Sequence, residues 1–73
     1  MNETLDLRGL KCPLPALLAK RALRGASRGA SFEIVTDDPL AVLDVPHMCR
    51  EENFDVVSLT RDGELTRMVL RKP

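Results

Sequence analysis

Hydrophobic and polar residues alternate at the start of the chain and then change their spacing. Leu5 and Leu7 are separated by polar residues over 4–7, the pattern of a half-buried strand. Gly9 ends this segment, and from 14 to 26 apolar residues recur at helical spacing. The apolar face of that helix would contain Leu14, Pro15, Leu18, Ala19, Ala22 and Leu23. A strand followed by an amphipathic helix is therefore predicted.

The next segments repeat the alternation of strand and helix. The β-branched and apolar run 32–36 predicts a second strand. It should lie parallel to the first, because a strand, a helix and a strand in succession form a βαβ unit. Asp38 and Pro39 then supply an N-cap and a first helical residue. Because proline inside a helix costs about 3 kcal/mol, Pro46 predicts a divided helix whose second piece is capped by Asp44.

Two further strands complete the pattern. Residues 56–61 and 65–71 have strand composition, and Asp62-Gly63 between them is a strong signal for a tight hairpin turn. The predicted order is βαβαββ. We therefore expect residues 1–73 to form one α/β (α+β) two-layer sandwich, with two helices on one face of a mixed four-stranded sheet.

Composition limits what such a domain can bind. The chain has 73 residues, no Trp, no Tyr and two Phe, so its thin aliphatic core leaves no room for a large cofactor. Two cysteines, no apparent leader and no membrane-spanning apolar run favour a reduced, cytoplasmic protein. The formal net charge is zero, but residues 1–36 hold six basic and three acidic side chains. This basic half could attract acidic protein surfaces.

The strongest candidate for chemistry is Cys12, directly before the first predicted helix. A helix N-terminus carries partial positive charge and unpaired N–H groups, which favour the thiolate, and Lys11 adds a cation. Pro13 suits the first helical position and Pro15 is tolerated in the first turn, because neither needs a backbone N–H there. Gly9 supplies the turn after the strand. The residues predict an exposed, activated nucleophile; a small packing residue is the alternative.

Cys49 has a different predicted role. It shares a helical spacing with Val45 and Met48, so the three should face the sheet together. We interpret Cys49 as a core residue, with a resolving or regulatory thiol as the alternative. His47, Cys49 and Cys12 lack the paired spacing of metal ligands, so we expect no metal.

Three short motifs follow one another along the chain. They are Cys12-Pro13-Leu14-Pro15, Asp37-Asp38-Pro39, and Asp44-Val45-Pro46 with Cys49 three residues further on. Together they resemble the TusA (SirA-like) sulfur-carrier family over essentially the whole chain. The resemblance implies the βαβαββ architecture of the C-terminal domain of translation initiation factor three. It also implies that Cys12 accepts a sulfane sulfur as a persulfide, with no bound cofactor.

The resemblance further implies partners and pathways. The sulfur donor would be a cysteine desulfurase or a rhodanese, and a downstream acceptor protein would receive the sulfur. Pathways of this family include tRNA thiolation, molybdenum cofactor synthesis and inorganic sulfur metabolism. Family members that thiolate tRNA commonly carry an acidic residue where this chain has Leu14. We expect a monomer that does not bind membranes.

Basic residues on the first helix suggest where a partner docks. Lys20, Arg21 and Arg24 share its outer face and are predicted to contact an acidic partner. Together with Arg28, these residues suggest a nucleic-acid or protein interaction domain as an alternative function. Zero net charge and few aromatic residues disfavour direct nucleic-acid binding. A thiol redox-sensing module is a further alternative, although the chain has no CxxC pair.

Overall fold

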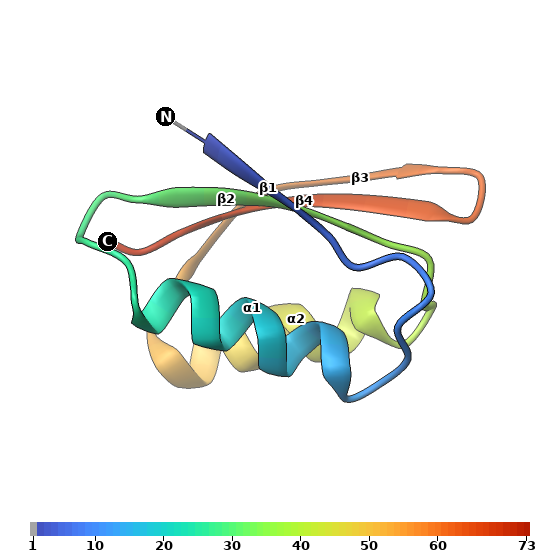
Figure 1. The fold of residues 1–73 in the computed structure, drawn as a ribbon, viewed down its shortest axis with the longest axis horizontal. Coiled ribbons are helices and arrows are strands. Elements are labelled where there is room, and N and C mark those ends of the chain that lie inside the picture. Colours follow the sequence, from blue (N-terminus) through green and yellow to red (C-terminus); the bar gives the residue numbers. More distant parts are fainter. Residues whose placement is uncertain (1) are drawn as a thin grey trace.

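Four strands and two helices form two layers in the computed structural model, which describes residues 2–73 (Figure 1). The elements are β1 (Asn2–Asp6), α1 (Leu14–Arg24), β2 (Ser31–Thr36), α2 (Ala41–Glu52), β3 (Asp55–Asp62) and β4 (Leu65–Arg71). The strand order is β1-β2-β4-β3; β1 is parallel to β2, and the other neighbours are antiparallel. Both helices cover the same face of this mixed sheet, which confirms the predicted sandwich (Figure 1).

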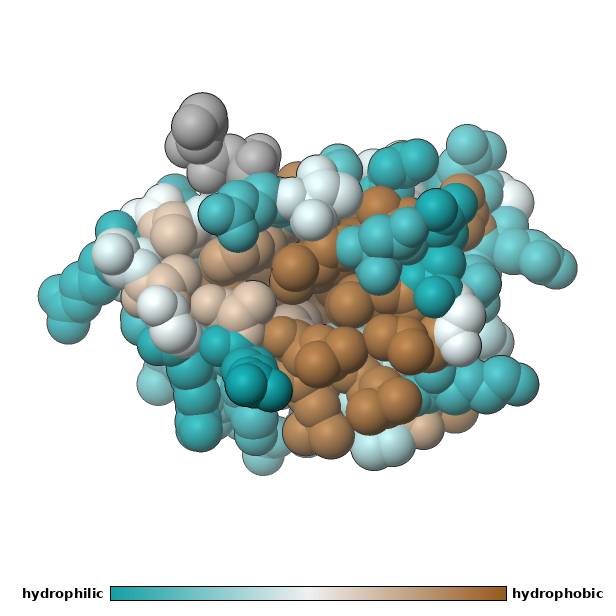
Figure 2. All heavy atoms as spheres, in the orientation of Figure 1, coloured by the Kyte–Doolittle hydropathy of each residue, from teal (hydrophilic) through white to brown (hydrophobic). Residues whose placement is uncertain are grey.

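The core lies between the sheet and the two helices. The central strands contribute alternate residues, and Ile34 lies opposite Met68 with both side chains buried. Leu23 of α1 and Val45 of α2 pack onto them and are also buried. Figure 2 shows further apolar side chains on one face of the molecule, between the sheet and the helices. The core is mostly aliphatic, as the composition predicts, and also includes the aromatic side chain of Phe32.

The start of α1 differs slightly from the prediction. Pro13 is the N-cap, with φ −95° and ψ 11°, rather than the first helical residue, and the Cys12–Pro13 peptide bond is cis. Pro15 lies in the first turn as expected, and its side chain is fully buried. The helix ends at Arg24, two residues before the predicted end, where Gly25 donates its backbone N–H to the carbonyl of Arg21.

The division predicted for α2 is wrong. The helix continues without interruption through Pro46, and Asp44 lies within its first turn rather than capping a second piece. Pro46 has no backbone N–H to donate within the helix. Packing of the helix on the sheet offsets this loss, since tertiary packing supplies most helix stability. The buried side chains of α2 are Ala41, Val45, Met48 and Cys49. The start also differs: Asp38 accepts a hydrogen bond from the Leu40 N–H (3.2 Å) and caps the turn before the helix.

The hairpin turn lies one residue later than predicted. Asp62 pairs with Leu65, so the two turn residues are Gly63 and Glu64, and Gly63 takes a φ of 61° that suits glycine. The β3 strand forms one edge of the sheet, and its register shifts between Val56 and Ser58, which marks a bulge. Most of its residues are exposed.

Candidate functional site

Two loops meet at one end of the sheet and hold Cys12. Because β1 and β2 are adjacent and parallel, the loops after both strands leave the sheet at the same end. The Gly9 N–H donates to Asp37 Oδ1 (3.0 Å), and the Cys12 N–H donates to Asp38 Oδ2 (2.6 Å). Gly9 has a φ of 82°, which confirms the predicted turn. Two aspartates therefore fix the backbone of the loop that carries the thiol.

A third aspartate reaches the sulfur itself. The Cys12 thiol is exposed and donates a hydrogen bond to Asp44 Oδ2, from the first turn of α2. This contact differs from the prediction, in which Asp44 is a local helix cap. The motif Asp44-Val45-Pro46 was the available signal, since it accompanies the cysteine motif in the family resemblance.

The electrostatic setting of Cys12 is the opposite of the predicted one. The hydrogen bond to Asp44, followed by burial and the negative charges of Asp44 and Asp38, raises the pKa of the thiol above its ordinary value. Within residues 2–73, Lys11 forms no ion pair that would offset these carboxylates. Carboxylates distant in sequence therefore favour the protonated thiol, although Cys12 lies near the positive end of α1.

An open hollow of about 600 Å³ lies beside the thiol. Its lining comes from both loops: Gly9, Lys11, Cys12, Asp37, Asp38, Pro39 and Leu40. The side chain of Leu40 is 54% exposed, so the hollow has an apolar rim as well as two carboxylates. The hollow leaves the thiol open to the molecular surface.

Comparison with known proteins identifies the family. The family model described as "Sulfurtransferase TusA" matches residues 3–72. The chain belongs to the TusA sulfurtransferase family. Its structure is similar to the crystal structure of a SirA-like protein from Desulfitobacterium hafniense, with a TM-score of 0.81 and 20% sequence identity over 97% of this chain and 96% of that one. The resemblance and the predicted fold are thereby confirmed, and sulfur transfer is established at the level of the family.

The basic residues predicted to dock a partner are not equivalent in this TusA-family protein. Arg24 is bound to α2 through an ion pair between its Nε and Glu52 Oε1 (2.6 Å). Arg21 is exposed, whereas Lys20 lines a groove between the two helices. With a rise of about 1.5 Å per residue, the row of basic residues runs along α1 away from Cys12. None of the helices in the described part of the chain is long and apolar enough to cross a bilayer.

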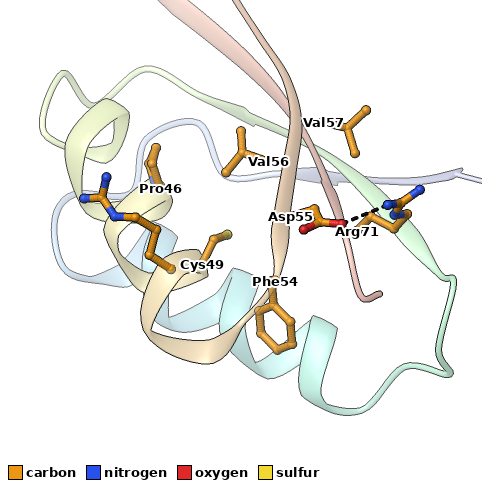
Figure 3. Close-up of a pocket in the computed structure, with 8 residues that line it drawn as sticks. Pro46, Cys49, Phe54, Asp55, Val56, Val57 and Arg71 are labelled. Atoms are coloured by element: carbon orange, nitrogen blue, oxygen red, sulfur yellow. Dashed lines mark hydrogen bonds and ion pairs between the residues drawn. The ribbon is translucent and has the colours of Figure 1, made fainter.

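Cys49 lies apart from the Cys12 site. Its side chain is fully buried, and burial followed by the charge of Asp55 raises the pKa of the thiol to about 11. Figure 3 shows it between α2 and β3, beside a groove of about 570 Å³ that Pro46, Phe54 and Val56 help to line. Both cysteines are free thiols. Cys49 therefore packs in the core, as interpreted from the sequence.

Proposed function

We propose that this TusA-family protein accepts a sulfane sulfur as a persulfide on Cys12 and passes it to an acceptor protein. The observation that supports this most directly is the placement of Cys12: an exposed thiol of the family motif, with its backbone N–H tied to Asp38 at 2.6 Å. A fixed backbone presents the sulfur at the molecular surface, where two proteins can meet. Gly9, Pro13 and Pro15 serve as positioning residues in this proposal.

The proposed cycle needs no bound cofactor, because the sulfur itself is the cargo. The Cys12 sulfur attacks the outer sulfur of a donor persulfide, and a new sulfur–sulfur bond forms as the donor's bond breaks. The donor's cysteine leaves as a thiolate and takes a proton, while Cys12 gives one up. In the second half, a thiolate of the acceptor attacks the outer sulfur on Cys12, the bond from that sulfur to Cys12 Sγ breaks, and Cys12 leaves as a thiolate that takes a proton. No outside oxidant or reductant is consumed, since persulfide and thiol exchange places.

The proposed partners are a cysteine desulfurase or a rhodanese as donor and a sulfur-accepting protein downstream. Lys20 and Arg21 are the cations we propose for docking an acidic partner surface, because Arg24 is already paired with Glu52. Leu14, 45% exposed and two residues after Cys12, offers the partner an apolar contact. We propose that the protein acts as a cytoplasmic monomer without binding nucleic acid directly.

The test is sulfur loading followed by intact mass measurement. Wild-type protein incubated with a cysteine desulfurase and free cysteine should gain the mass of one sulfur atom. Cys12→Ser should gain none, and the matched control Cys49→Ser should gain the same mass as wild type. Loading that persists in Cys12→Ser and disappears in Cys49→Ser would show that the sulfur is carried elsewhere.

A further inference from the structure

The Asp44 carboxylate lies where it can receive the thiol proton of Cys12. Asp44 Oδ2 already accepts the hydrogen bond from Cys12 Sγ, and this satisfies the geometric requirement for a general base. Within residues 2–73, Asp44 forms no ion pair, so no cation competes for its oxygens. The first turn of α2 also stabilises a negative charge at this position through the helix macrodipole.

Charged groups from several elements surround the Cys12 sulfur. Asp44 faces the thiol from α2, and Asp38 from the loop after β2, where it binds the Cys12 backbone. Asp37 and Lys11 line the same hollow, and Asp37 is engaged with the Gly9 N–H. Lys20 of α1 and His47 and Glu51 of α2 line a groove together with Asp44. The hydrogen bond to Asp44 and the negative charges of Asp44 and Asp38 disfavour a thiolate at rest. Because the thiolate is the effective nucleophile, the proton must leave during the attack.

We propose that Asp44 is the general base of sulfur uptake: its Oδ2 takes the Cys12 proton while Cys12 Sγ attacks the outer sulfur of an incoming persulfide. The new bond joins Sγ to that outer sulfur, and the donor's sulfur–sulfur bond breaks. Its electron pair leaves on the donor's inner sulfur, which takes a proton from solvent, and Asp44 returns its proton to solvent. This role rests on the proposed function of Cys12 and assigns a catalytic residue to it.

The first measurement tests the contact without any sulfur transfer. Thiolate absorbance is titrated in a Cys49→Ala background, so that only Cys12 contributes. In the Asp44→Asn variant, the Cys12 thiol should ionise at a lower pH than in the parent, because residue 44 no longer carries a negative charge. The matched control is Glu51→Gln, which removes the same charge from an exposed position on the same helix and should leave the titration unchanged. An unchanged titration in Asp44→Asn would overturn the proposal.

The second measurement tests the base, with glutathione persulfide as donor so that protein docking plays no part. At neutral pH, Asp44→Asn should take up sulfur about 10²-fold more slowly, the lower end of what a positioned base contributes, although more of its sulfur is thiolate. The deficit should vanish at alkaline pH, where the thiolate forms without help. Asp44→Glu, which keeps the carboxylate, should restore part of the rate. Glu51→Gln should match the parent.

The outcomes separate this role from the function on which it rests. Faster uptake by Asp44→Asn, in proportion to its thiolate fraction, would show that Asp44 only restrains the thiol and would overturn its role as a base. Absence of uptake in the parent protein, or full uptake by Cys12→Ser, would instead refute Cys12 as the sulfur carrier, whatever the titration shows. Circular dichroism of each variant checks that the fold is intact.

Discussion

Alkaline pH should destabilise this protein through the buried thiol of Cys49. Burial, with a smaller effect of Asp55, raises the pKa of this thiol from 9.0 to about 11. In the unfolded chain the thiol is exposed and ionises near its ordinary value. Below about pH 9 both states hold the proton and Cys49 adds no pH dependence. Between about pH 9 and 11 the unfolded state loses the proton while the folded state keeps it, so stability falls.

The size of the loss follows from the shift. One pKa unit corresponds to about 1.4 kcal/mol, so the free energy of unfolding should fall by about 1.4 kcal/mol at pH ~10 and by about 2.7 kcal/mol once both states are ionised. A domain of this size loses about 4–8 °C of Tm per kcal/mol. The Cys49 contribution at pH ~10 is therefore about 6–11 °C.

The assay compares thermal unfolding of Cys12→Ser with that of Cys12→Ser/Cys49→Ala across this pH range. The shared Cys12→Ser background removes the other thiol, whose pKa is also raised. The chain has no tyrosine, so lysine and arginine are the other side chains that titrate here, and they are common to both proteins. Lost packing in Cys49→Ala lowers Tm equally at every pH. If the two melting temperatures fall in parallel as the pH rises, the buried thiol is not the cause.

Three further substitutions probe the fold and the loop that carries the thiol. Leu23→Ala empties a fully buried position and should cost about 2–5 kcal/mol in urea denaturation; a loss under half of the lower figure would contradict the packing described. Gly9→Ala meets no atom within 4 Å but must adopt a φ of 82°, so calorimetry should show a loss of about 1–2 kcal/mol, and sulfur loading should slow as the loop shifts. Arg24→Ala breaks an exposed ion pair with Glu52 and should cost less than about 1 kcal/mol in chemical denaturation; a larger cost would mean that the pair fixes α1 against α2.

Local patterns in the sequence were sufficient for most of the fold. The alternation at Leu5 and Leu7, the helical spacing of 14–24 and the β-branched run of β2 depend on neighbouring residues only, so they predicted the correct elements. The predicted break of α2 at Pro46 was wrong because the cost of proline is estimated from neighbouring residues alone. The packing of α2 on the sheet, which stabilises the helix, depends on residues distant in sequence. The bounds of helices and turns moved by one or two residues for the same reason.

The sequence predicted the nucleophile of the site, Cys12, but not the side chains that surround it. The motif around Cys12 is contiguous, so it could be found from the sequence. Asp44 contacts the thiol across 32 positions, and only the parallel pairing of β1 and β2 brings its helix to that end of the sheet. The predicted ionisation of Cys12 rested only on the positive charge of Lys11 and on the N-terminus of α1. Charges supplied by the second loop and second helix reverse it.

The bulge in β3 bears on how copies of this protein coexist at high concentration. An edge strand offers its free N–H and C=O groups to any other chain, and regular apolar edges promote aggregation. The register shift between Val56 and Ser58 interrupts that template. Asp62 adds a charge at one end of the strand, whereas Asp55 at the other end is paired with Arg71. Edge-to-edge pairing of two copies along β3 is thereby opposed, which leaves the Cys12 thiol of each copy exposed at high protein concentration.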